Sequence, residues 1–283
     1  MENVLHQPVA RRGTGRRAAL VGCVLAAIAL VAVVTCGLGL YGQASVTDFD
    51  RKALAPTLAH PFGTDMMGRD MFARTMAGLS TSVLVGLLAA CVSSIIALAL
   101  GCAAALGGKR VDAAVSWLID LMMGVPHIVL LVLISYALGK GFWGVTIGVA
   151  LTHWASLARV VRAEVLQCRQ SNFVAVARRL GRTPLQIARS HMVPYVLPQF
   201  VVGLILLFPH AILHEAAITF LGFGLPPEQP AIGVILSESM SYLSTGAWWL
   251  AVFPGLALIL VVVLFDVCGR SLRRLIDPHT AQR

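Results

Sequence analysis

Long apolar intervals that carry almost no charge recur along the chain, and each has roughly the length of a helix that spans a bilayer, ~20 residues. Their approximate bounds are residues 18–40, 79–106, 113–138, 142–161, 195–220 and 247–267. The third interval contains Asp120 and the fourth contains His153. Ionisable groups at membrane depth normally face a bundle interior or a water-filled path. The pattern therefore predicts an all-α, polytopic membrane protein with about six transmembrane helices.

The composition supports a membrane location. Hydrophobic residues make up 58% of the chain and charged residues only 12%, whereas a soluble domain is about 25% charged. A net charge of +9 would suggest a nucleic-acid partner in a soluble protein, but here the cations lie between the apolar intervals. In that position they act as topology signals. We therefore expect contact with the lipid bilayer and no nucleic acid.

The 22 lysines and arginines are divided unevenly between the two sides of the membrane. Most of them lie before the first apolar interval, after the second, after the fourth and after the last. Cytoplasmic loops carry the excess of positive charge, so both termini and the loops after the second and fourth helices are predicted to be cytoplasmic. The first apolar run is uncharged and longer than the core of a signal peptide, which predicts an uncleaved helix.

The predicted organisation has five parts, of which a cytoplasmic loop is the most informative. They are a cytoplasmic N-terminal tail (1–17), a first transmembrane helix (18–41), an external segment (42–78), a five-helix core (79–270) with a cytoplasmic loop at 169–194, and a cytoplasmic tail (271–283). The loop is polar and basic with an apolar side, and should form short helices. Its charge supports two interpretations equally, contact with anionic lipid headgroups and docking of a partner protein.

Two catalytic motifs are missing from the sequence. The chain has no G-x-x-x-x-G-K-[ST] pattern, so it carries no recognisable nucleotide site of its own. His214 and Glu215 begin like the zinc-protease motif H-E-x-x-H, but Ile218 stands where the second histidine is needed. We therefore expect a protein that is not an enzyme and binds no cofactor itself.

Residues 62–74, with the sequence FGTDMMGRDMFAR, resemble a signature of one of the two inner-membrane permeases of dipeptide, oligopeptide and nickel ABC importers. The matching positions are Gly63, Thr64, Asp65, Gly68, Arg69 and Asp70. In physical terms, the segment is a glycine-punctuated turn in which Asp70 caps a helix.

A second segment is similar to the family's loop that docks a permease onto its ATPase subunits. The positions that carry or flank this resemblance are Phe173, Ala175, Ala177, Gly181, Pro184, Val193 and Pro194. The family's glutamate is replaced by Ala175 and its isoleucine by His191. Ala177 and Gly181 share one helix face, where small side chains permit close approach of a partner.

Two further segments complete the resemblance. Residues 218–227, ITFLGFGLPP, are similar to the family's SFLGLGxxPP, and residues 266–278 resemble its C-terminal GDxLRDxLDP, with Asp277 and Pro278 retained. The resemblance implies the type I ABC importer permease fold in a bacterial inner (plasma) membrane. It also implies a second permease subunit, two ATPase subunits that bind ATP and Mg²⁺, an external substrate-binding protein, and transport by alternating access.

The histidines bear on the cargo. His210 and His214 lie at i and i+4 on one helix face, where both can approach one cation transiently. We expect the translocation path to be lined by His153, His210, His214, Glu215 and Asp120. By spacing alone, histidines that hydrogen-bond to their neighbours are the simpler interpretation. The pair, and a histidine before Trp154, look like features of the nickel-type second permease subunit.

The resemblance therefore favours nickel or a metal chelate as the cargo. A dipeptide or oligopeptide permease is the alternative within the importer class. A second alternative, from another class, is an ATP-independent channel or a structural membrane subunit.

Overall fold

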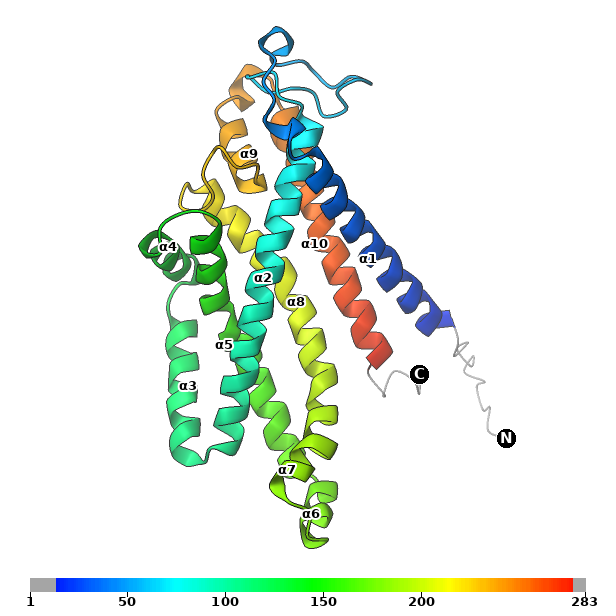
Figure 1. Ribbon diagram of the computed structural model, residues 1–283, viewed down its shortest axis with the longest axis vertical. Helices are drawn as coiled ribbons and strands as arrows, with labels where there is room; N and C mark the ends of the chain where they lie inside the picture. The colour runs from blue at the N-terminus through cyan, green and yellow to red at the C-terminus, as the bar shows by residue number, and fades with distance from the viewer. Residues whose placement is uncertain (1–13, 277–283) are drawn as a thin grey trace, which may run out of the picture.

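The protein is all-α, as the hydropathy pattern predicts, in a computed structural model that describes residues 14–276 (Figure 1). The longer helices are α1 (Thr14–Leu40), α2 (Met71–Leu106), α3 (Lys109–Gly124), α4 (His127–Ala137), α5 (Phe142–Arg169), α8 (Val193–Phe220) and α10 (Trp249–Ile276). The shorter elements are η1 (Gln43–Ser45), η2 (Phe49–Arg51), α6 (Asn172–Arg179), α7 (Pro184–Ile187), the wider turn η3 (Ala188–Met192), α9 (Ile232–Met240) and η4 (Leu243–Thr245).

Within the described residues, five helices are long and apolar enough to cross a membrane, and a bent pair brings the number to as many as six. The five contain α1, α2, α5, α8 and α10, and the bent pair is α3 with α4. This range agrees with the predicted span number, since each interval found in the sequence corresponds to one of these units.

The third interval differs from the prediction because it is not one helix. α3 and α4 meet at an angle of 96°. Val125 is extended, with φ −84° and ψ 136°, because the ring of a following proline disfavours the α conformation. Pro126 itself has no N–H to donate. The break makes His127 the first residue of α4.

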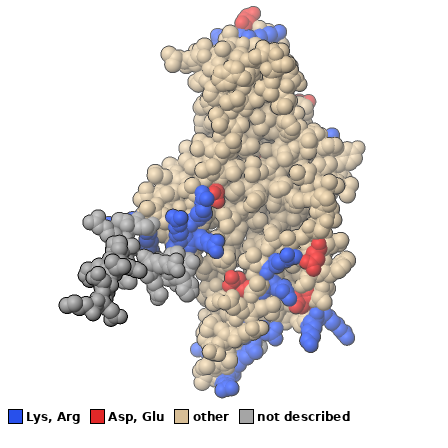
Figure 2. Space-filling view, turned by 180° about the vertical axis from the view of Figure 1, so that it is seen from behind, with Lys and Arg blue, Asp and Glu red and all other residues tan. Residues whose placement is uncertain are grey.

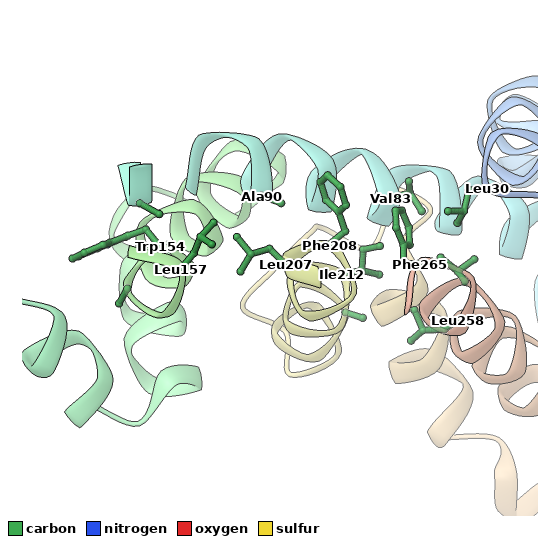
Figure 3. Close-up of a cluster of buried hydrophobic side chains, with 14 of the residues drawn as sticks. Leu30, Val83, Ala90, Trp154, Leu157, Leu207, Phe208, Ile212, Leu258 and Phe265 are labelled. Carbon is green, nitrogen blue, oxygen red and sulfur yellow. The ribbon is translucent and has the colours of Figure 1, made fainter. Parts of the chain in front are cut away.

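α2 is the central helix of the bundle. It packs against α5, α1 and α8, and α1 also lies along α10. Figure 3 shows α2 passing above α5, α8 and α10, with apolar side chains that include Val83, Phe208 and Phe265 between them. Small residues permit these approaches. A Cβ on Gly86 of α2 would lie 2.6 Å from Cγ1 of Ile212 on α8. A Cβ on Gly37 of α1 would overlap the carbonyl of Met76 on α2, so α1 packs closely against the bundle.

The charges mark two ends of the molecule. In Figure 1, α6 and α7 lie at the bottom, α1 begins and α10 ends in the lower half, and residues 41–70 and α9 lie at the top. Figure 2 shows lysines and arginines gathered in the lower half and a smaller group at the top. The band between them is almost uncharged on that face, as expected for a surface in contact with lipid.

Two boundaries differ from the predicted ones. α2 begins at Met71 rather than at 79, because Asp70 caps it there: its Oδ1 accepts a hydrogen bond of 2.8 Å from the N–H of Ala73. α10 continues to Ile276, past the predicted end of the core at 270. The predicted resemblance at Asp277 and Pro278 lies outside the described residues.

Candidate functional site

A cavity of about 570 Å³ lies where the α3–α4 break faces α5 and α8. Its walls are formed by the residues on either side of the break, by the middle of α5 and by the C-terminal half of α8, namely Met122, Met123, Gly124, Val125, Pro126, His127, Thr152, His153, Ala155, Ser156, Leu207, His210 and His214. The predicted path residues His153, His210 and His214 thus border one space.

Three imidazoles converge at this cavity. The ring centroids of His127 and His153 are 4.5 Å apart, those of His127 and His214 are 4.5 Å apart, and those of His153 and His214 are 4.9 Å apart. One nitrogen of each ring lies within 4.8 Å of the others. Because the three side chains come from α4, α5 and α8, the cluster exists only when these helices are packed together. We call these residues the histidine triad.

Backbone carbonyls orient two of the three rings. Nδ1 of His153 lies 2.9 Å from the carbonyl oxygen of Val149, and Nδ1 of His214 lies 2.8 Å from that of His210. A carbonyl can only accept, so both Nδ1 atoms donate, and in the neutral ring each Nε2 then keeps its lone pair. The Nε2 atoms of His127 and His153 are buried and have no hydrogen-bond partner among the described residues.

His127 is absent from the predicted path residues. It falls inside an apolar interval whose pattern predicts one continuous helix, and a single histidine in such an interval does not indicate a functional site. The signal that could have singled it out is the sequence Gly124-Val125-Pro126 directly before it, because a proline after a glycine predicts a helix end. A histidine that begins a new helix in mid-membrane faces a break in the bundle.

The remaining predicted path residues lie apart from the cavity. Asp120 is exposed on α3, where its Oδ1 accepts a hydrogen bond of 2.7 Å from Arg159. Glu215 is fully buried on α8, where its Oε1 accepts a hydrogen bond of 2.9 Å from the hydroxyl of Thr219. Neither residue is among those that line the cavity, whereas the exposed His210 is.

The signature segment forms a network of ion pairs at the opposite end from α6 and α7. Oδ2 of Asp65 accepts hydrogen bonds of 2.6 Å from Arg69 and 2.7 Å from Arg74, while its Oδ1 accepts one of 2.8 Å from the N–H of Met67. Oε2 of Glu238, on α9, lies 3.0 Å from Arg74 and 3.1 Å from Arg69. The two arginines therefore join the signature segment to α9.

Gly68 and Gly63 are required by this turn. Gly68 has φ 75°, and a Cβ there would overlap the carbonyl of Asp48. Gly63 has φ 72°, and a Cβ there would lie 2.5 Å from the carbonyl oxygen of Leu54. Thr64 is fully buried, and its hydroxyl accepts a hydrogen bond of 2.9 Å from the N–H of Leu54. The signature residues thus fix the fold of the segment.

The segment formed by α6, α7 and η3 exposes apolar side chains, and we call it the coupling segment after the docking role predicted from the sequence. Phe173, Val176 and Leu180 are all exposed on α6 or at its end, and Leu180 is 77% exposed. Leu185 on α7 is exposed to a similar extent. Such a group on a polar, basic segment is typical of a surface that contacts a partner or lipid.

Ala177 and Gly181 do not share one outward face, because Ala177 is buried whereas Gly181 is exposed. Ala177 is buried with Val174, Cys168 and Ile187 in a small core of the segment itself. Gly181 has φ 75° and ends α6, and the next residue donates its N–H to the carbonyl of Ala177 at 3.1 Å. The outward face is therefore carried by the larger side chains.

The other predicted coupling residues lie along the same segment. Ala175 is exposed on α6, and Pro184 begins α7. Val193 and Pro194 are exposed and form the first turn of α8, which continues directly from η3.

The chain is similar to known proteins over most of its length. Residues 95–282 match the family described as "Binding-protein-dependent transport system inner membrane component". A Brucella suis protein named as a permease of a peptide transport system is 35% identical over 270 residues, which cover 95% of this chain and 90% of that protein. The dipeptide transport system permease protein DppC of Bacillus subtilis is 31% identical over 225 residues, covering 80% and 70%.

The fold also has a solved counterpart. A chain of the MetNI methionine ABC transporter, solved in inward-facing conformations, superposes with a TM-score of 0.60 at 19% identity. The match covers 73% of this chain and 98% of that one. At this identity the likeness concerns the fold, which is that of a type I ABC importer permease, as the sequence motifs imply.

Proposed function

The chain belongs to the family of binding-protein-dependent transport system inner-membrane components, and from this premise we propose that it is the permease subunit of an ATP-driven peptide importer. The observation that carries the proposal is the naming of its relatives, which at 31% to 36% identity are peptide and dipeptide permeases. This cargo replaces the nickel expected from the histidines, because none of these relatives is named for a metal.

The proposed path runs along the histidine-lined cavity. Its walls come from α3, α4, α5 and α8, and α3 and α4 expose large apolar side chains, such as Trp117, Leu121 and Ile128, that a second permease subunit could cover. A path shared by two subunits explains why His210, which borders the cavity, is exposed on this chain. A second permease subunit is therefore part of the proposal.

The coupling segment is the proposed contact with an ATPase subunit. Phe173, Val176 and Leu180 offer an apolar face, and the arginines of α6 supply positive charge beside it. Closure of two ATPase subunits on ATP would move this segment, and α5 and α8 would follow because the segment lies between them in the chain. Alternating access then follows from re-packing of these helices.

The proposed orientation puts both termini and the coupling segment in the cytoplasm, with the signature segment outside. It rests on the excess of lysine and arginine at the end that holds α6 and α7 (Figure 2). In this orientation an external binding protein would meet the end formed by residues 41–70 and α9.

The test is transport by the whole importer. The chain, its second permease, the two ATPases and the binding protein are reconstituted in vesicles, and uptake of radiolabelled dipeptides and tetrapeptides is measured with ATP and with a non-hydrolysable analogue. We expect ATP-dependent peptide uptake. Uptake of nickel alone, or transport that continues without the ATPases, would overturn the proposal in favour of a metal importer or a passive channel.

A further inference from the structure

We infer that the histidine triad is a binding site for one divalent late transition-metal ion, such as Ni²⁺, Co²⁺, Cu²⁺ or Zn²⁺. The juxtaposition of His127, His153 and His214 carries the inference. The role given to the ion in transport rests on the proposed function, whereas ion binding itself does not.

The geometry of the triad is close to that of a coordinated ion. An ion bound tetrahedrally at about 2.0–2.1 Å from each nitrogen holds the nitrogens roughly 3.4 Å apart. The nitrogens of the triad already lie within 4.8 Å of one another, so small side-chain rotations close the site. Because the group consists of imidazoles without a carboxylate, it suits Zn²⁺, Cu²⁺ and Ni²⁺ and disfavours Mg²⁺ and Ca²⁺.

The rings are already held in the form that binds metal. The carbonyls of Val149 and His210 accept from Nδ1 of His153 and His214, so each Nε2 presents its lone pair. Metal-bound histidines almost always have such a partner on their other nitrogen. His153 is 7% exposed and its Nε2 has no partner within the described residues, a state that an ion would relieve.

Three protein ligands leave one coordination position open, as in sites that exchange ligands. The cavity beside the triad provides room for that fourth ligand. Within a peptide importer, the fourth ligand is a donor atom of the cargo, such as a peptide amine, imidazole or carboxylate. The structure thus points to peptides that carry a metal ion as a cargo class of the site.

The origin of the three ligands explains how such a site releases its ion. The histidines belong to α4, α5 and α8, which contact one another in this conformation. Alternating access re-packs these helices, so it separates the ligands and breaks the coordination. A path must release what it binds, and a site shared among moving helices does so at each cycle.

The first experiment measures ion binding to the purified whole importer after metal removal. Co²⁺ is titrated and its visible absorption recorded, and Ni²⁺ is titrated by calorimetry. We expect the visible bands of a tetrahedral or five-coordinate Co²⁺ site. His153→Gln and His127→Ala should each weaken Co²⁺ binding at least ~10-fold, because each removes one of three ligands. Size-exclusion elution and co-purification of the ATPase subunits show whether the variants fold.

His210→Ala is the informative comparison. Its side chain lies outside the triad, and the backbone carbonyl that orients His214 remains in the variant. The triad therefore predicts unchanged Co²⁺ affinity, whereas a site built from the i, i+4 pair predicts a loss. A loss in His210→Ala, or unchanged affinity in folded His153→Gln, would overturn the inference. So would the absence of Co²⁺ bands in the folded importer, which leaves three histidines that pack together without binding an ion.

The second experiment separates this inference from the proposed function. Uptake of one histidine-containing peptide is measured with and without bound Ni²⁺. We expect His127→Ala and His153→Gln to reduce uptake of the loaded peptide several-fold more than uptake of the free peptide. Equal uptake of both forms by the variants would overturn the cargo role. If Co²⁺ binds to the triad while no peptide is transported, the proposed function fails and the metal site stands.

Discussion

Arg74 on α2 and Glu238 on α9 form an ion pair across 164 residues of sequence, with 3.0 Å between the guanidinium and carboxylate. The Arg74 side chain is only 3% exposed and also pairs with Asp65. The signature segment resembles a family signature in sequence, and the ion pairs of Asp65, Arg69 and Arg74 are internal to the protein. Its charges hold together the end of the molecule that the proposed orientation places outside.

Replacing Arg74 by alanine should destabilise the protein strongly. Removing Arg74 breaks the buried pair with Asp65 and leaves Arg69 to compensate that carboxylate, and breaking a buried pair costs up to about 3–5 kcal/mol. Arg51→Ala is the matched control, because Arg51 pairs with Asp48 where both side chains are well exposed, a pair worth about 0–1 kcal/mol. Thermal unfolding of each detergent-purified variant measures its loss of stability. Equal unfolding midpoints for Arg74→Ala and Arg51→Ala would contradict the structural role of the Arg74 ion pairs.

Gly68→Ala should prevent correct folding of the signature segment. The added methyl group would overlap the carbonyl of Asp48, and backbone cannot give way as a flexible side chain can. Gly222→Ala is the control for the backbone strain that a positive φ imposes on alanine. Gly222 has a similar φ of 83°, but a Cβ there would meet no other atom within 4 Å, so this variant lacks the steric overlap. Expression of folded protein by fluorescence-detected size exclusion is the measurement, and a normal yield of Gly68→Ala would contradict the close approach.

Leu180→Glu should uncouple the permease from its ATPases without unfolding it. The side chain is already in solvent, so the change costs little in the isolated chain, but it places a charge in the proposed apolar contact. We expect co-purification of the ATPases to fall several-fold. Leu58→Glu, at a fully exposed leucine near the opposite end, should leave co-purification unchanged. Equal retention of the ATPases by both variants would count against the coupling segment.

Cys23 and Cys268 should cross-link when the purified protein is oxidised. Their sulfur atoms lie 3.4 Å apart between α1 and α10. Copper–phenanthroline accepts the two electrons as the thiols lose their protons and join. Mass spectrometry should find the linked peptides in the wild type and not in Cys23→Ser. If the wild type gives no link, α1 does not lie along α10 as described.

The histidine triad illustrates how far sequence reasoning reaches. His153, His210 and His214 can be selected as path residues from their depth in apolar intervals and their spacing, and all three border the cavity. The geometry nevertheless pairs His214 with His127 and His153, not with the side chain of His210. Spacing along one helix cannot find a partner that another helix supplies.

The coupling segment is likewise only partly predictable from the sequence. Its existence, basic charge and short helices follow from composition, and Gly181 ends α6 as a glycine with positive φ does. Which of its small residues face inward does not follow, because Ala177 packs against α7 and the end of α5. An alanine is compatible with either environment, so only the packing of three helices decides.

By itself, the sequence determined the all-helical membrane class and the approximate positions of the spans. These properties follow from the transfer of each segment into lipid, which depends on its own residues. Tertiary structure decided that the helix break at Pro126 brings His127 to the triad, that Glu215 is buried and that the signature charges are paired. Such relationships depend on the rotation and crossing of helices, which are set by contacts between segments far apart in the chain.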